Sequence, residues 1–360
     1  MFSATDHRFM SLALQLAARG LFTTDPNPRV GCVLVADGKV VGQGWHRRAG
    51  EAHAEILALA EASDRARGAT AYVTLEPCSH HGRTPPCAQA LISAGISEVV
   101  VAMADPNPAV GGEGLERLTR AGLTVRSGLM ERQARDLNPG FIKRHQTGLP
   151  WVRVKLAVSL DGRTAAADGS SKWITGPAAR ENVQRWRGRA SAILTGIGTV
   201  LADDPRLNVR LDGYERQPLR VVVDSSFRMP ADAAMLALPG PVLVAGCREV
   251  RAIGDAEILE LPPAADGRVE LEALLEALAA RDINEVHVEA GPRLSGAFLA
   301  AGLVDELLVY QAPCLLGDRG EPLAELPGME NMDQRLHLLP LEDRIVGGDR
   351  LMRFGFPEDD

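Results

Sequence analysis

The chain has 360 residues, of which 46% are hydrophobic and 24% are charged, and its formal net charge is −8 at pH 7. This length permits two domains, because a single hydrophobic core usually stops growing at about 250–300 residues. The acidic balance argues against a general nucleic-acid or membrane-surface binder, which would carry a basic face. A local basic pocket for a small phosphate is still compatible with this charge.

The first 140 or so residues alternate helix-like and strand-like segments. Residues 1–20 have the apolar spacing of an amphipathic helix and lack the features of a signal peptide, and no stretch of the chain has the continuous apolar length of a membrane span. Two strand-like runs then meet across Asp37-Gly38, which predicts a hairpin. Single helices and strands alternate afterwards, which is typical of a layered α/β domain with parallel strand pairs. Because the sequence shows neither signal-peptide features nor a membrane span, we expect a cytoplasmic protein.

Residues 143–150 ("KRHQTGLP") are polar, contain glycine and proline, and separate two periodic regions, so they form the predicted joint. A second series of strands and helices follows, which includes a strand over "AILTGIGTVL" (192–201) and a strand, turn, helix and strand over 285–313. The sequence thus predicts two α/β domains, over residues 1–146 and 147–360.

Two of the five cysteines, Cys78 and Cys87, lie in "TLEPCSHHGRTPPC". They form a disulfide, hold a metal, or are two unrelated core thiols. A sparse and odd set of cysteines is a poor disulfide framework in a reducing compartment. Cys32, Cys247 and Cys314 lie in apolar or turn contexts, and we interpret them as structural thiols.

A histidine upstream favours the metal. His53 precedes Cys78 by 25 residues, and Glu55 follows in "EAHAEILALA". One histidine and two cysteines leave the fourth position of a tetrahedral zinc site open for water, whereas structural zinc sites fill all four. Glu55 is then a proton shuttle, and it converges with His53 only if His53 stands at the mouth of a helix. Cys87 follows two prolines at a helix start, where the positive end of the helix favours a thiolate.

These residue types point to hydrolytic deamination. Zinc lowers the pKa of a bound water towards neutrality, and His-x-Glu followed by Pro-Cys and a further Cys is a signature of zinc deaminases. Hydroxide adds to the carbon that bears an exocyclic amino group on a pyrimidine-like ring, while Glu55 moves a proton from the water to the departing ammonia. The alternative is a zinc-stabilised binding protein, which predicts a fourth ligand and no need for Glu55.

The cysteine spacing distinguishes the chain from nucleic-acid deaminases, which use Cys-x-x-Cys and a basic strand-binding face. Six further residues separate the cysteines here, and this longer form, with "DPNPRVG" upstream, resembles the bifunctional riboflavin-biosynthesis deaminase–reductase family. The resemblance runs essentially end to end, through "VSLDGRTA", "SKWITG", "LTGIGTVLADDPRLNVR" and "VEAGPRLSGAFL". One departure is Ala52, where the family usually has proline before the metal-binding histidine.

The resemblance implies a cytidine-deaminase-like three-layer α/β/α domain followed by a dihydrofolate-reductase-like α/β domain. In the first domain it implies that Asn27 hydrogen-bonds the substrate, although an asparagine between two prolines is also ordinary turn chemistry. His80 and His81 are expected to line the pocket or add polarity to the loop. Arg83 either meets a substrate phosphate or is a solvated loop arginine.

The second domain lacks a convincing dinucleotide fingerprint, because "LTGIGTVLADDP" has Gly196 and Gly198 without a third glycine at the right spacing. The strand-to-helix turn at Gly291 is either a phosphate site or a plain turn. A dihydrofolate-reductase-like domain agrees with the absent fingerprint, and the resemblance implies NADPH. The implied NADPH residues are Ala157, Trp173, Thr199, Asp203, Ser225, Gly291, Pro292, Arg293, Leu294, Ser295, Gly296 and Ala297.

The resemblance also implies a set of substrate residues in the second domain, namely Ser171, Arg187, Leu207, Arg210 and Glu289. The guanidinium fork of arginine suits a sugar phosphate, although Arg187 is also compatible with a solvated helix face. Lys155 and Asp161 are expected to orient the ribose, or else to be structural charges at strand ends.

The implied pathway has two steps. Deamination of 2,5-diamino-6-ribosylamino-4(3H)-pyrimidinone 5′-phosphate is followed by hydride delivery from NADPH to C1 of the open, imine-like ribosyl group, which gives 5-amino-6-ribitylamino-uracil 5′-phosphate. Loss of one activity is disfavoured because the reductase motif loops are intact. We expect no nucleic-acid or membrane partner, and "FLAAGLVDELLVY" is either core or the subunit interface of a homo-oligomer, a dimer or tetramer.

Overall fold

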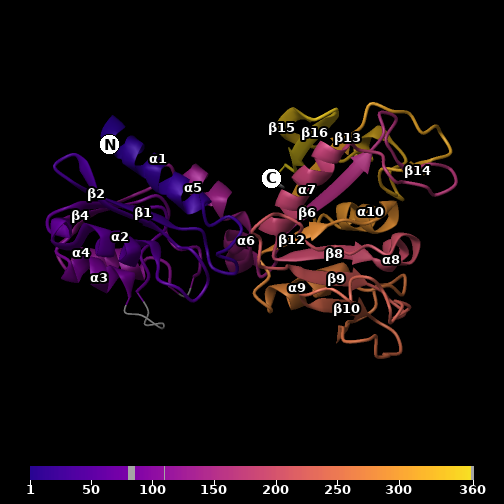
Figure 1. The fold of residues 1–360 in the computed structure, drawn as a ribbon, viewed down its shortest axis with the longest axis horizontal. Coiled ribbons are helices and arrows are strands. Elements are labelled where there is room, and N and C mark those ends of the chain that lie inside the picture. Colours follow the sequence, from indigo (N-terminus) through magenta and orange to yellow (C-terminus); the bar gives the residue numbers. More distant parts are fainter. Residues whose placement is uncertain (80–85, 109, 358–360) are drawn as a thin grey trace. The chain divides into compact units, whose positions relative to one another are not determined.

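The computed structural model describes residues 1–79, 86–108 and 110–357. The chain divides into two compact units, Met1–Gly148 and Leu149–Asp360 (Figure 1). The boundary predicted from the sequence, between residues 146 and 147, lies beside this division at the end of helix α6 (Pro139–Thr147). None of the described helices is long and apolar enough to cross a membrane.

The first unit is built on a five-stranded sheet with the order β2-β1-β3-β4-β5. Its strands are β1 (Gly31–Ala36), β2 (Lys39–Trp45), β3 (Thr70–Val73), β4 (Glu98–Val101) and β5 (Thr124–Ser127). β1 is antiparallel to β2 and β3, whereas β3, β4 and β5 are parallel. The predicted hairpin is confirmed, because Asp37 and Gly38 join β1 to β2 with φ angles of 50° and 71°.

Helices cover both faces of this sheet. They are α1 (Ala4–Ala18), α2 (Ala54–Ala62), α3 (Cys87–Ser93), α4 (Glu113–Arg120), α5 (Glu131–Leu137) and α6, with the 3-10 turn η1 (Ser63–Ala66). Because side chains alternate along a strand, Val33 packs with α1 on one face of β1, while Cys32 and Leu34 pack with α2 and α3 on the other. Figure 1 shows α1 and α5 on one side and α2, α3 and α4 on the opposite side. The unit is therefore the predicted three-layer α/β/α domain, and Cys32 is a core thiol.

The second unit is built on a nine-stranded sheet with the order β11-β10-β9-β8-β12-β6-β13-β16-β15. These strands are β6 (Trp151–Val158), β8 (Ala192–Gly196), β9 (Leu219–Val223), β10 (Val242–Gly246), β11 (Glu257–Glu260), β12 (Glu285–Val288), β13 (Glu306–Gln311), β15 (Leu339–Val346) and β16 (Asp349–Gly355). The strands from β11 to β13 are parallel, and the β15–β16 hairpin extends the sheet with antiparallel pairing. A separate short pair consists of β7 (Arg163–Ala165) and β14 (Glu321–Pro322).

The helices of this unit are α7 (Pro177–Arg189), α8 (Ile197–Asp203), α9 (Leu271–Ala279) and α10 (Pro292–Ala300), with the 3-10 turn η2 (Met332–Gln334). α9 and α10 pack with Val152, Val154 and Leu156 of β6 on one face of the sheet. α7 packs on the other face, against Leu308 and Tyr310 of β13. The run 298–310, which the sequence left as core or interface, is core, because its large apolar side chains are buried in these clusters or, for Leu303, packed against them.

The predicted strand over 192–201 is wrong in its second half. β8 ends at Gly196, and α8 begins at Ile197. Ile197 and Val200 are three residues apart and face the same apolar cluster, as a helix requires. A short apolar run does not by itself distinguish strand from helix. The turn has a functional consequence, because it opens the carboxyl end of β8 towards a cavity.

Candidate active sites

His53 and Glu55 lie at the start of α2. His53 is the residue before the first turn, with extended backbone angles of φ −71° and ψ 164°, and the helix begins at Ala54. This extended conformation lets two residues that are only two positions apart approach one site. The predicted placement of His53 at the mouth of a helix is confirmed.

The three predicted ligands converge. His53 Nδ1 lies 3.3 Å from Cys87 Sγ and 3.6 Å from Cys78 Sγ, and the three ligand atoms are within 4.8 Å of one another. Zn–S bonds of about 2.3 Å and Zn–N bonds of about 2.0–2.1 Å place the nitrogen and sulfur of a tetrahedral site about 3.5 Å apart. The donor set therefore fits zinc. Within the described ranges no fourth His, Cys, Asp or Glu joins the group.

The contact between the two cysteines shifts their pKa values in opposite directions. Cys87 is buried in the first turn of α3, and its backbone N–H donates to Cys78 Sγ at 3.3 Å. The side-chain hydrogen bond from Cys87 lowers the pKa of Cys78 to about 4, against the opposing effect of burial. The same hydrogen bond, together with burial, raises the pKa of Cys87. One thiolate is thus already favoured at neutral pH, as a metal ligand requires.

Glu55 lies beside the ligands without joining them. It is 3% exposed, and burial raises the pKa of its carboxyl to about 7, although the nearby His53 opposes this shift. A buried carboxyl with a pKa near neutrality is suited both to accept and to donate a proton.

Asn27 reaches this site through a histidine that the sequence analysis missed. The Asn27 amide nitrogen lies 3.1 Å from His46 Nε2, and His46 Nδ1 lies 3.2 Å from the Ala52 carbonyl oxygen. The His46 ring also meets the His53 ring edge to face, with centroids 5.4 Å apart. Burial lowers the pKa of His46. The signal in the sequence was a polar residue directly after a strand, seven positions before His53.

Glu76 is a second residue that the sequence analysis missed. Its buried carboxylate accepts hydrogen bonds from the backbone N–H groups of Asp105, Gly112, Gly114 and Leu115 at 2.8–3.2 Å. It therefore ties the start of α4 to the strand end that leads to Cys78. The predicted pocket residues His80, His81 and Arg83 lie outside the described residues.

The second unit contains a cavity of about 1650 Å³ at the carboxyl ends of its parallel strands. This is the edge at which open α/β sheets bind ligands. The predicted NADPH residues that line it are Ala157, Trp173, Thr199, Asp203, Ser225, Gly291, Pro292, Arg293, Leu294 and Ala297. The predicted substrate residues Ser171, Arg187, Leu207, Arg210 and Glu289 also line it, as does Lys155.

Three predicted residues lie elsewhere. Ser295 is fully buried and its hydroxyl donates to the Ala290 carbonyl at 3.3 Å. Gly296 is packed against the backbone, because a Cβ there would lie 1.9 Å from the Glu325 carbonyl oxygen. Asp161 accepts hydrogen bonds from Ser159 Oγ at 2.5 Å and from two backbone N–H groups of residues 316 and 317. Ser295 and Gly296 therefore fix the packing of α10, whereas Asp161 ties the loop after β6 to residues 316 and 317.

Glycines leave room at two helix starts that border the cavity, Gly198 in the first turn of α8 and Gly291 directly before α10. A Cβ built at Gly291 or Gly198 would meet nothing within 4 Å. Gly291 precedes α10, whose first residue is Pro292. Open space beside the first backbone N–H groups of a helix suits a phosphate.

A buried ion pair crosses the cavity wall. The guanidinium of Arg187 binds both carboxylate oxygens of Glu289, at 2.5 and 2.9 Å, and also donates to the Asn208 carbonyl at 3.2 Å. Burial opposes the ionisation of Glu289, but Arg187, with help from His287 and Lys155, holds its pKa well below the usual range. Burial lowers the pKa of Lys155. Of the alternatives for Arg187, the solvated helix face is therefore excluded.

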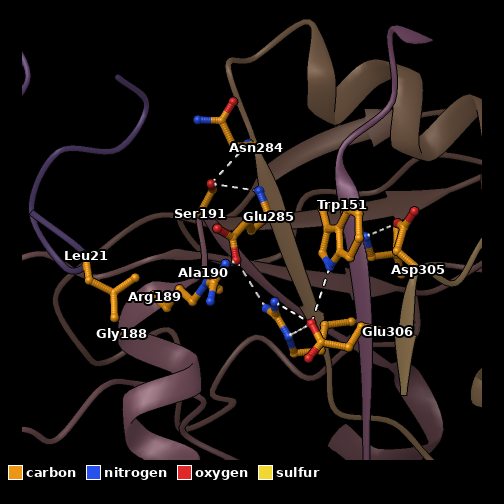
Figure 2. A network of polar contacts seen from close by, with 12 residues as sticks. Leu21, Trp151, Gly188, Arg189, Ala190, Ser191, Asn284, Glu285, Asp305 and Glu306 are labelled. Atoms are coloured by element: carbon orange, nitrogen blue, oxygen red, sulfur yellow. Dashed lines mark hydrogen bonds and ion pairs between the residues drawn. The ribbon is translucent and has the colours of Figure 1, made fainter. Parts of the chain in front are cut away.

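A second ionic network lies at the opposite ends of the same strands (Figure 2). Arg153, which is 1% exposed, pairs with Glu285 at 3.2 Å and with Glu306 at 2.7 Å. Arg189 donates to Glu285 at 2.7 Å, and Trp151 Nε1 donates to Glu306 at 3.4 Å. This network does not reach the cavity, so its role is structural.

Two family models match the chain. The model described as the cytidine and deoxycytidylate deaminase zinc-binding region covers residues 3–103, and the RibD C-terminal domain covers residues 150–346. The match to the zinc-binding model covers His53, Cys78 and Cys87, and the other match covers most of the second unit.

Whole-length relatives carry the same name. Riboflavin biosynthesis protein RibD of Escherichia coli K12 is 50% identical over 357 residues, which are 96% of this chain and 97% of the relative. The Acinetobacter baumannii RibD structure superposes with a TM-score of 0.93 at 46% identity and covers 98% of this chain and 99% of its own. A Thermotoga maritima structure, described as a diaminohydroxyphosphoribosylaminopyrimidine deaminase/5-amino-6-(5-phosphoribosylamino)uracil reductase, superposes with a TM-score of 0.86 at 32% identity, over 98% of this chain and 99% of that one.

Proposed function

The chain belongs to the RibD family of riboflavin biosynthesis proteins, and from this premise we propose which of its residues carry out the two reactions. The protein is a bifunctional enzyme, with a zinc-dependent deaminase and an NADPH-dependent reductase. We assign the deaminase to the first unit and the reductase to the second. The proposed substrates are those named for the Thermotoga maritima relative.

In the deaminase, His53, Cys78 and Cys87 hold the metal, which when bound supplies hydroxide at neutral pH. Glu55 lies next to the metal ligands. Its carboxylate accepts a proton from the attacking water and returns it to the amino group that leaves as ammonia. The observation that carries this proposal is the convergence of three ligand atoms within 4.8 Å next to a buried carboxyl that is not a ligand.

The test is Glu55→Gln, which keeps the size of the side chain and removes its ability to carry a proton. We expect ammonia release to fall by about 10²–10⁴-fold, with the zinc content unchanged. Glu61→Gln on the same helix is the matched control, because Glu61 is exposed. Full deaminase activity in Glu55→Gln would favour a zinc-stabilised binding role instead.

In the reductase, NADPH in the cavity supplies the hydride for C1 of the open ribosyl group. Glu289 and Lys155 lie on neighbouring strands at the carboxyl edge of the sheet, where we propose that they contact the ribosyl chain. Two nitrogens of the Arg187 guanidinium, Nε and Nη2, already donate hydrogen bonds to the two carboxylate oxygens of Glu289. Arg210 has only a neutral partner among the described residues, since its guanidinium donates to Asn208 Oδ1 at 2.9 Å. We therefore propose Arg210 as the principal ligand of the substrate phosphate.

Arg210→Gln should raise the KM for the deaminated ribosyl phosphate about 10–100-fold, because a hydrogen bond to a charged group contributes roughly 1.5–3 kcal/mol. The KM for NADPH and the rate at saturating substrate should change little. Arg185→Gln is the control, since Arg185 is exposed on α7. An unchanged substrate KM in Arg210→Gln would move the phosphate site elsewhere in the cavity.

We further propose that the enzyme acts in the cytoplasm as a homo-oligomer. All five cysteines are free, as a reducing compartment favours. The edge strand β15 exposes Leu339, Leu341 and Ile345 by 48%, 55% and 67%, and a second subunit would remove this apolar surface from water. Light scattering tests the assembly, and a mass of one 38.5 kDa chain would contradict it.

A further inference from the structure

His46 lies between Asn27 and the turn that leads to His53, the first of the proposed metal ligands. It directly follows β2, and its backbone N–H donates to the Val30 carbonyl at 2.9 Å, which anchors it to the chain before β1. Its side chain is 3% exposed. Both ring nitrogens are within hydrogen-bond distance of a polar atom, Ala52 O at 3.2 Å and the Asn27 amide at 3.1 Å.

Hydrogen-bond valence fixes the direction of both bonds. A backbone carbonyl accepts hydrogen bonds and never donates them, so Nδ1 must carry the ring proton. In the neutral ring Nε2 then has a lone pair and accepts. Its partner on Asn27 must therefore be the Nδ2–H₂ group, and the Asn27 side-chain oxygen is directed away from His46. No described residue donates to that oxygen, so it remains available for a ligand.

We propose that His46 is a positioning residue of the deaminase, which holds the turn before His53 through the Ala52 carbonyl and orients Asn27 as a hydrogen-bond acceptor. The proposal rests on the proposed deaminase site. It narrows the substrate chemistry, because the group that meets the Asn27 side-chain oxygen must be an N–H or O–H donor. A pyrimidine N–H, an exocyclic amino group or a ribose hydroxyl has that character, whereas a ring carbonyl does not.

The residue at position 52 makes the first role testable in this chain. Ala52 leaves its φ angle free, whereas a proline would fix φ near about −65°. The Ala52 N–H donates to no described residue, so Ala52→Pro would remove no hydrogen bond in that part of the chain. The bond from His46 therefore restrains this turn together with the Glu51 N–H to Arg48 carbonyl bond, and a proline at position 52 is another way to restrain it.

Substitutions at His46 separate the two roles. His46→Phe removes both hydrogen bonds, and we expect zinc loss to a chromogenic chelator to be about 10–100-fold easier, as for other groups that orient metal ligands. His46→Asn places an amide N–H near the position of Nδ1, so it should retain zinc but lose kcat/KM for deamination. Ala52→Pro in the His46→Phe background should restore zinc retention and leave kcat/KM low, because Asn27 stays unoriented. Ala52→Pro alone is the control.

Nitrogen NMR of the zinc-loaded full chain reads the arrangement directly. We expect a protonated, pyrrole-type Nδ1 and a pyridine-type Nε2 for His46, and loss of the Nε2 hydrogen bond in Asn27→Ala. NADPH oxidation with the deaminated substrate should be equal in all variants, which shows that the second domain is intact.

A protonated Nε2 with an unprotonated Nδ1 would overturn the proposal, as would His46→Phe with wild-type zinc retention and kcat/KM. Equal loss of zinc in His46→Phe with and without Ala52→Pro would also contradict it. The wild-type protein distinguishes the levels of failure. If it neither binds zinc nor releases ammonia, the deaminase assignment fails, and if it does both, only the role of His46 is in question.

Discussion

At the scale of single residues, Glu306 illustrates how a buried charge is maintained. Its side chain is 3% exposed and lies between Arg153 and Arg353, each with a nitrogen 2.7 Å from a carboxylate oxygen. Burial alone would raise the pKa of Glu306, but the charges of Arg153 and Arg353 outweigh it and lower the pKa to about 2. The carboxylate is therefore more stable in the folded domain than in the unfolded chain.

Because of this pKa shift, the contribution of Glu306 to the unfolding free energy depends on pH within a defined acidic range. Because the pKa of Glu306 falls from 4.5 to about 2 on folding, its contribution is complete above the unfolded pKa and is lost as the pH falls through the folded one. The loss between about pH 4.5 and 2 is roughly 3 kcal/mol of unfolding free energy. Urea unfolding of the reductase domain at several pH values should show that the unfolding free energy falls less steeply with decreasing pH in Glu306→Gln than in the wild type. Glu330→Gln, at an exposed position, should keep the wild-type slope, and equal slopes in all three proteins would refute the assignment.

The convergence of His53, Cys78 and Cys87 was predictable because this combination of residue types in this order is rare in a sequence. His53, Glu55 and Cys87 each lie at a helix start that the sequence marks by its own pattern. His46 and Glu76 were missed because their roles arise from hydrogen bonds to backbone groups of other segments, which no sequence motif marks. Arg153 was missed for the same reason, since an arginine inside a parallel strand gives no sign of the two carboxylates beside it.

At the scale of elements, close contact between β2 and α2 fixes the position of the helix start that follows His53. A Cβ at Gly42 would lie 2.2 Å from the Ala58 carbonyl oxygen, and one at Gly44 would lie 2.4 Å from the Ala54 carbonyl oxygen. The helix therefore rests directly on the strand backbone, and its first turn is held at a fixed height above the sheet. Because His53 directly precedes α2, the same contact also fixes the position of His53.

Gly44→Ala should displace the start of α2, because the added methyl group meets backbone rather than a flexible side chain. We expect a loss of about 1–3 kcal/mol in the stability of the first domain and weaker zinc retention. Thermal unfolding and chelator competition measure the two effects. Gln43→Ala changes the neighbouring exposed residue and should alter neither. An unchanged unfolding temperature and zinc content in Gly44→Ala would show that α2 does not depend on this contact.

Elements with a clear periodicity or turn signal were predicted well, including the Asp37-Gly38 hairpin and the alternation of strands and helices. The transition from β8 to α8 was not, because "AILTGIGTVL" is apolar throughout and suits either structure. Tertiary contacts decide there, since Ile197 and Val200 pack on one apolar cluster only as a helix.

At the scale of the whole molecule, the chain carries two sites in two units, each with a separate sheet and its own apolar clusters. The proposed metal ligands belong to the first unit, and the large cavity belongs to the second. The chemistry of each unit therefore depends on residues of that unit.

Removal of the metal should separate the activities. Dialysis against a zinc chelator should abolish ammonia release, while NADPH oxidation with the deaminated substrate continues at its original rate. Added zinc should restore the first activity. Parallel loss of NADPH oxidation on chelation would show that the second unit also depends on the metal, which would contradict this division.

The charged face of β6 has a consequence for inhibitors. Arg153 near the start of the strand is enclosed by carboxylates, whereas Lys155, two residues further along the same face, lines the cavity. Arg153 thus stabilises the fold, while Lys155 forms part of the cavity wall. A substitution in the wall that confers resistance to an inhibitor need not unfold the domain. The Arg187–Glu289 pair is the exception, because loss of either partner leaves an uncompensated buried charge. An inhibitor that contacts Arg187 and Glu289 should therefore select fewer tolerated resistance substitutions than one that contacts other residues of the cavity wall.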